Sequence, residues 1–315
     1  MSFLTLLAAF CLIIAFLDFP FTSAWSIEKP ALVPRFTRNE LSRREWASKF
    51  VSMLTTVSLL SRSPVQPAWA DLVKDTNDGG LMSTTNVADM LRAVPTFTIV
   101  DAKGVPYMVV GEDAKVTGYF FSTFEEADRI LKLAKTSADK AIRQAKVNRE
   151  PVDENPWVNA RISTVPLDFA VTTAAKSMYT KSYFQVAPAV DDVDDALAIT
   201  KTQDLAEGKV PLFYIKDFTI ENPTSLANQS PLYFRKSELE QAYRRAHPGE
   251  KELPDILVTE LFALVLAMVK PGGTDEDLKT VVIVPPKGSS QKAKLCEKAG
   301  GKEPAFVLGQ RNLVL

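Results

Sequence analysis

The residue types that most often carry out catalysis are scarce in this chain. His247 is the only histidine among 315 residues, so a Ser/His/Asp or Cys/His arrangement would have to use it. It follows Arg244-Arg245-Ala246 and precedes a proline, which predicts a position at a helix end, close to the last carbonyl groups. We therefore interpret His247 as a helix-end residue and predict that the protein is not an enzyme.

The sequence predicts no cofactor and no metal site. Cys11 and Cys296 are the only cysteines, too few with one histidine for a Cys/His metal site. Acidic pairs at 191–192 and 194–195 suggest cation binding, but their place in the first turns of an expected helix favours compensation of the helix dipole. Gly79-Gly80 and Gly272-Gly273 lack the neighbours that phosphate-binding loops need and are interpreted as linkers.

Composition is that of an ordinary globular protein, with 46% hydrophobic and 24% charged residues and a net charge of −1. Because there is no basic excess, nucleic-acid binding is disfavoured. The length suffices for one large domain or two small ones.

The chain begins with what we interpret as a signal peptide over residues 1–24. Residues 4–17 are largely apolar but short for a membrane span, and Thr22-Ser23-Ala24 places small residues before a cleavage site. An N-terminal membrane anchor is the alternative. Residues 25–49 are basic and contain two prolines, a pattern typical of a transit peptide.

A second apolar targeting segment follows at 50–70 and ends in Ala-Trp-Ala. Arg43-Arg44 ahead of it is typical of a twin-arginine signal for transfer into the thylakoid lumen. Alternatively, the transit peptide extends to Ala70. The composite leader, with Trp25 just after the first cleavage, resembles those of algae with secondary plastids.

The region after residue 70 contains an internal repeat. Val-Pro-x-Phe opens an expected strand at 94–97 and again at 210–213, an offset of 116. Residues 119–125 match 232–238 at an offset of 113, and each match is followed by an expected helix. Apolar periodicity predicts helices at 86–92, 123–147, 170–179, 191–206, 237–246 and 255–269, and strands at 94–100, 105–110, 162–169, 182–187, 210–215, 280–284 and 305–308.

These elements predict an α+β fold with two pseudo-symmetric repeated halves, each a small mixed sheet covered by helices on one face. The first half is placed at 71–180 and the second at 181–315, with a C-terminal extension. Capping boxes are expected at Ser122 to Glu125 and at Ser237 to Glu240, and residues 285–292 are expected to form a loop.

The repeat resembles the twenty-two-kilodalton subunit family of the plastid inner-envelope protein translocon (Tic complex). The resemblance runs from about residue 87 to 246 and is carried by the Val-Pro-x-Phe strands, the Phe-Phe-Ser of 120–122 and above all 231–240, Pro-Leu-Tyr-Phe-Arg-Lys-Ser-Glu-Leu-Glu. Ser237 stands where that family usually has an acidic residue, and the tail after residue 248 exceeds the resemblance.

The resemblance implies a non-enzymatic, chaperone-like factor of protein import that binds unfolded plastid preproteins and contacts translocon subunits, with peripheral membrane association left open. Together with the leader, it predicts a location in a secondary plastid, in the thylakoid lumen or the envelope intermembrane space. The alternative is a structural or assembly factor of a thylakoid-lumen complex.

The repeated aromatic residues have two interpretations. They pack in the core of each sheet, or some of them form an apolar surface that binds clients. The candidates for that client-binding surface are Phe97, Phe120, Phe121, Phe213, Tyr233 and Phe234.

Overall fold

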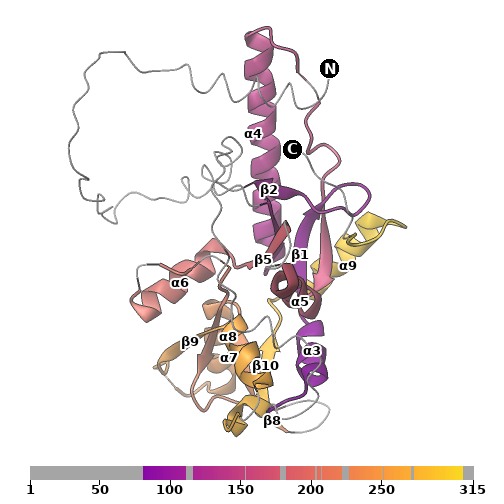
Figure 1. The fold of residues 1–315 in the computed structure, drawn as a ribbon. Coiled ribbons are helices and arrows are strands. Elements are labelled where there is room, and N and C mark those ends of the chain that lie inside the picture. Colours follow the sequence, from indigo (N-terminus) through magenta and orange to yellow (C-terminus); the bar gives the residue numbers. More distant parts are fainter. Residues whose placement is uncertain are drawn as a thin grey trace, which may run out of the picture.

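The structure, a computed structural model, describes residues 81–110, 116–152, 154–177, 182–202, 204–206, 208–221, 227–250, 252–270 and 273–307 (Figure 1). The predicted targeting segments at 1–24, 25–49 and 50–70 lie outside the described residues. So do Gly79-Gly80, Gly272 and the end of the strand predicted at 305–308.

The first part of the described chain builds one five-stranded sheet with its helices. Its elements are α3 (Thr84–Arg92), β1 (Pro95–Val100), β2 (Met108–Val110), β3 (Val116–Phe121), α4 (Phe124–Val147), β4 (Arg161–Pro166), α5 (Leu167–Ser177) and β5 (Ser182–Ala187). β3 pairs in parallel with β5 on one side and antiparallel with β2 and β1 on the other, and β4 lies beyond β1.

The second part repeats this plan. After α6 (Val190–Thr200), which follows β5, its elements are β6 (Pro211–Ile215), β7 (Ile220–Glu221), β8 (Asn228–Tyr233), α7 (Lys236–Ala246), β9 (Ile256–Glu260), α8 (Leu261–Val269), the 3-10 helix η2 (Glu276–Thr280), β10 (Val281–Val284) and α9 (Ser289–Gly300). β8 pairs in parallel with β10 and antiparallel with β7 and β6, and β9 lies beyond β6. The predicted mixed-sheet α+β fold with two similar halves is therefore confirmed.

The register of the strands corrects the sequence match between the halves by one residue. Phe97 lies opposite Phe121, and Phe213 lies opposite Tyr233. Tyr233 therefore corresponds to Phe121, whereas the predicted match paired it with Phe120. A slip of one residue exchanges the two faces of a strand, so the corrected match puts equivalent side chains into equivalent cores.

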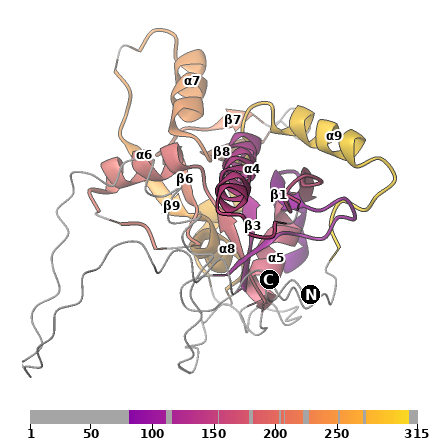
Figure 2. The same cartoon turned by 90° about the horizontal axis from the view of Figure 1, so that it is seen from above.

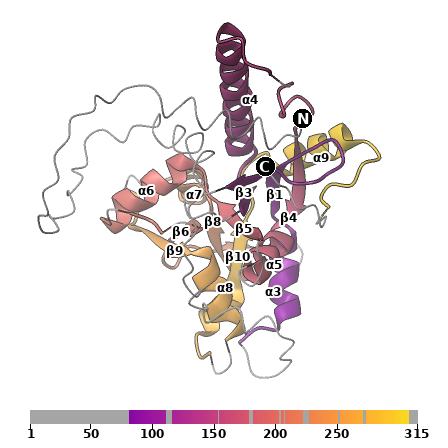
Figure 3. The same cartoon turned by 45° about the horizontal axis from the view of Figure 1, so that its top comes forward.

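Both faces of each sheet are covered, which corrects the prediction of helices on one face. The central core lies between the two sheets and takes residues from α3, α5 and α8. The outer face of the first sheet packs against α4 and α9, and that of the second against α6 and α7. Figure 3 shows α3, α5 and α8 gathered at the end of the molecule away from α4. Strands buried on both faces need not alternate, and β1 is buried from Thr96 to Val100.

The last helix of each repeat packs on the sheet of the other half. Each half has the order β-β-β-α-β-α-β-α, with α6 as the last element of the first and α9 as the last of the second. α6 contacts β6 and β9, whereas α9 contacts β1 and β4. Figure 2, which views α4 nearly end-on, shows α6 and α9 on opposite sides of it. This helix exchange ties the two halves together.

Several predicted boundaries are corrected. The boundary at 180/181 falls ahead of β5, which belongs to the first sheet. The helix predicted at 255–269 is strand β9 followed by α8, the same strand-to-helix step as from β4 to α5. The predicted loop at 285–292 contains the start of α9, a helix that the sequence pattern does not predict.

The predicted capping boxes also shift. At α4 the N-cap is Thr123, whose Oγ accepts the amide hydrogen of Glu126, one residue later than predicted. At α7 the N-cap is Arg235, which makes no side-chain cap hydrogen bond.

Candidate functional site

The six aromatic residues predicted as a client-binding surface are all buried. Their exposed fractions lie between 0% and 7%. Phe97 and Phe121 pack in the outer core of the first sheet, and Phe213 and Tyr233 pack in that of the second. The central core contains the other two, Phe120 and Phe234. In this conformation they are core residues, and they do not form an exposed surface.

His247 and Cys296, the two residues considered for nucleophilic catalysis, are both held in packing contacts. His247 ends α7, with Nδ1 3.2 Å from the carbonyl oxygen of Tyr243 and its ring stacked on that of Tyr243 at 4.3 Å. Cys296 is buried in α9, and burial raises the pKa of its thiol, which disfavours the reactive thiolate. Neither residue is placed to activate the other.

The acidic residues at the start of α6 differ in how deeply they are buried. Asp191 and Asp194 are exposed, but Asp192 is 5% exposed, and its Oδ2 has no hydrogen-bond partner among the described residues. Burial raises the pKa of Asp192 to about 7, with Arg235 opposing the shift. Within the described ranges, no group of three or more His, Cys, Asp or Glu side chains is arranged to hold a metal ion.

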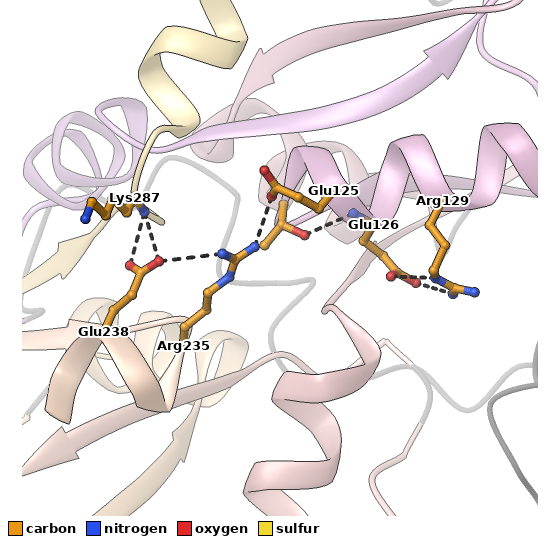
Figure 4. A network of polar contacts seen from close by, with 7 residues as sticks. Glu125, Glu126, Arg129, Arg235, Glu238 and Lys287 are labelled. Carbon is orange, nitrogen blue, oxygen red and sulfur yellow. Dashed lines mark hydrogen bonds and ion pairs between the residues drawn. The ribbon is translucent and has the colours of Figure 1, made fainter. Parts of the chain in front are cut away.

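A polar junction joins the halves where the first turns of α4 and α7 meet (Figure 4). Arg235 Nη2 donates to Glu125 Oε2 at 3.0 Å, and its Nη1 lies 3.7 Å from Glu238 Oε1. Both Glu238 oxygens accept from the backbone N–H of Lys287, each at 3.1 Å. One arginine and one glutamate thus link α4, α7 and the segment leading into α9.

The same end of α4 carries a second ion pair. Arg129 donates through Nε and Nη2 to the two oxygens of Glu126, at 2.9 and 2.5 Å. Glu126 is 7% exposed and Arg129 is 39% exposed, so a buried carboxylate is paired here with a guanidinium that reaches solvent. The contacts of Arg235 and Glu238 thus connect the two halves through charged side chains.

The segment 304–307, which we call the C-terminal strap, crosses the inner face of the first sheet without regular secondary structure. It is bound through its main chain. Arg161 Nη2 donates to the Pro304 carbonyl at 3.0 Å, Ser163 Oγ donates to the Ala305 carbonyl at 2.5 Å, and the Val307 N–H donates to the Gly104 carbonyl at 2.9 Å.

One side chain of the strap is inserted among aromatic rings. The ring centroid of Phe306 lies 5.5 Å from that of Phe120, 5.4 Å from Phe169 and 6.0 Å from Phe184. Gly104, with φ of +84°, permits this approach, because a Cβ there would lie 2.4 Å from the Pro304 carbonyl oxygen. The sequence pattern does not predict this site, although Phe306 falls in the segment 305–308 that is predicted as a last strand.

The fold and the junction define a duplicated α+β protein whose halves exchange a helix. The family model described as the Tic22-like family matches residues 44–294, so the chain belongs to the Tic22-like family, as the sequence resemblance predicted. This family is associated with protein transport in plastids and is not a catalytic family. Across the described ranges, no helix is both long and apolar enough to cross a membrane.

Solved structures similar to this chain include two Tic22 proteins. Tic22 from Plasmodium falciparum has 19% identity and a TM-score of 0.49, over 68% of this chain and 98% of that one. Anabaena Tic22, whose description adds the words protein transport, has 17% identity and a TM-score of 0.49. The match covers 68% of this chain and 97% of that one. A search of curated proteins finds no match.

Proposed function

We propose that this chain is a non-enzymatic, chaperone-like factor of protein import into the plastid, which binds unfolded preproteins. Family membership supports the transport role. The observation that supports binding of unfolded chains is the C-terminal strap, because the fold already holds an irregular polypeptide segment through its main chain and one aromatic side chain. Contacts to main-chain atoms depend little on sequence, which suits a protein with many clients.

The test compares an unfolded precursor with the same precursor in its folded form. We expect cross-linking of the purified protein to the unfolded precursor and suppression of its aggregation, with neither effect on the folded form. Equal or absent binding of both forms would overturn this function. Stable co-purification with one folded complex of the thylakoid lumen would favour the assembly-factor alternative.

We also propose a location and a processing scheme, which the leader supports. Signal-peptide removal after Ala24 and a final cleavage after Ala70 would release a mature chain into the thylakoid lumen of a secondary plastid, with the envelope intermembrane space as the alternative. The amino-terminal sequence of the protein isolated from fractionated plastids tests both points. For the envelope intermembrane space, we propose translocon subunits as partners, together with a peripheral contact with the membrane.

A further inference from the structure

We propose that the surface under the C-terminal strap is a polypeptide-binding site, and that the strap occupies it as a tethered ligand which a client segment displaces. The site consists of the rings of Phe120, Phe169 and Phe184 and the polar groups of Gly104, Arg161 and Ser163. This inference rests on the proposed function and names where and how the client would bind.

The contacts define the chemistry of the occupant. Two donors, Arg161 and Ser163, bind consecutive main-chain carbonyls, and the Gly104 carbonyl accepts the N–H two residues further along. Any residue offers these main-chain groups, so this part of the site is independent of sequence. Within residues 304–307, Phe306 is the side chain that inserts among aromatic rings. We therefore expect a client segment to carry an aromatic residue at that position.

The strap is attached in a way that allows release. Pro304 and Ala305 are exposed, and Phe306 and Val307 are half-buried. Among the described residues, the three hydrogen bonds above and two half-buried side chains hold the strap, and hydrogen bonds that water can replace add little net stability. α9, by contrast, buries Cys296 in the outer core of the first sheet. The strap can leave its site while α9 stays in place.

The strap also lies beyond the part of the chain that the family model matches. That match ends at residue 294, whereas all six residues of the site lie inside it. The site thus belongs to the matched fold, and its occupant belongs to the tail that follows. A tethered segment has an effective concentration on the order of millimolar, so the strap sets a threshold that a client must exceed.

The first experiment opens the site by a substitution in the full-length protein. Phe306→Asp puts a carboxylate among three rings, and the desolvation cost drives the strap out. A labelled peptide with the sequence of residues 301–307 is then titrated by fluorescence anisotropy. We expect it to bind Phe306→Asp at least about tenfold more tightly than the unchanged protein, because the tethered competitor is gone.

Two controls accompany this titration. Leu295→Asp places the same charge on α9 at a side chain that is 59% exposed, and it should leave peptide binding as in the unchanged protein. A peptide in which the phenylalanine is replaced by alanine should bind Phe306→Asp at least about tenfold more weakly. A folded Phe306→Asp protein that binds neither peptide, or both equally, overturns the proposal.

The second experiment needs no substitution, so it tests displacement of the strap even if Phe306→Asp does not fold. Hydrogen exchange of the Val307 amide, which Gly104 protects, is followed with and without excess peptide. We expect faster exchange in the strap and unchanged exchange in α9. Unchanged exchange in the strap at saturating peptide overturns the proposal, as does exchange that rises equally in α9.

A competition assay separates this inference from the proposed function. If unfolded precursor displaces the labelled peptide from Phe306→Asp, the result supports both the proposed function and the strap site as the client site. If the precursor binds the protein but leaves the peptide in place, the strap site is not the client site, and the inference fails while the function remains. If the peptide binds and no precursor does, the function fails, and with it the client role of the site.

Discussion

Arg235 of α7 and Glu125 of α4 form an ion pair across the two halves, with 3.0 Å between Nη2 and Oε2, although 110 residues separate them in the sequence. Glu125 is 59% exposed, and a pair of that kind contributes less than about 1 kcal/mol to the free energy of unfolding. Arg235 also faces Glu238, so its loss leaves a partly buried carboxylate without its cation.

We therefore predict that Arg235→Ala destabilises the protein by about 1–3 kcal/mol and Glu125→Ala by less than about 1 kcal/mol. Urea denaturation followed by circular dichroism measures both. Arg244→Ala, at an exposed position on α7, serves as the control and should lie close to the unchanged protein. Equal losses for Arg235→Ala and Glu125→Ala would show that Arg235 acts only through Glu125.

The buried carboxyl of Asp192 predicts that stability falls as pH rises towards neutrality. Burial raises its pKa from 3.8 to about 7, with Asp195, Asp191 and Glu238 adding to the shift and Arg235 opposing it. The folded state therefore binds an extra proton within this window. The free energy of unfolding should decrease by about 1.4 kcal/mol per pH unit there and level off above pH 7.

Asp192→Asn removes this dependence, because the amide stays neutral. Urea denaturation at pH 5, 6, 7 and 8 should show a shallower pH slope for the variant and greater stability than the unchanged protein at the highest pH. Asp194→Asn, at an exposed position on the same helix, should retain the slope. A slope that persists in Asp192→Asn would assign the pH dependence to other groups.

Gly104 should be required for attachment of the C-terminal strap. In Gly104→Ala the new methyl group would meet the Pro304 carbonyl oxygen at 2.4 Å, so we expect faster hydrogen exchange at Val307. Gly208→Ala is the matched control, since Gly208 has a similar φ of +80° while its nearest neighbours lie at 3.7 Å. In both variants an alanine must adopt a positive φ, which lowers the stability of the protein. Only Gly104→Ala should release the strap.

Cys296 reports whether α9 stays on the first sheet. Cys296 is 4% exposed, so in a Cys11→Ser background we expect slow labelling by a thiol reagent until the protein unfolds. Ala293→Glu places a charge against the same core and should speed labelling by at least about tenfold. Leu295→Glu, on the exposed side, should not. Fast labelling of the Cys11→Ser protein under native conditions would contradict the packing of α9.

The duplicated strands could be predicted because their pattern is local. Val94 and Val210 each precede a proline and are fully buried, and each carbonyl accepts the amide hydrogen of the residue that begins α5 or α8. The predicted match of Phe120 with Tyr233 is wrong by one residue, because Tyr233 corresponds to Phe121. Two adjacent aromatic residues point to opposite faces of a strand, and residue type alone does not show which of them belongs to which face. Only the register of the sheet decides between them.

Other features could not be predicted from local patterns. Residues 256–269 are apolar apart from Thr259 and Glu260, and an apolar run with so little periodicity does not distinguish a buried strand from a buried helix. α9 is rich in lysine and buries little besides Cys296, so its apolar face is too narrow to recognise. The Glu125–Arg235 pair and the contact of Phe306 with Phe169 join distant segments, which periodicity cannot detect.

The exchange of α6 and α9 has a consequence for what a single repeat could do alone. Two identical units would adopt this arrangement if each gave its last helix to its neighbour and the two were then fused, which is the architecture of a domain-swapped dimer in one chain. A fragment ending after α6 would hold a helix that fits a sheet it does not possess, and its own sheet would lack the cover that α9 provides. Each surface is completed only by the other repeat, because α6 contacts β6 and β9 whereas α9 contacts β1 and β4.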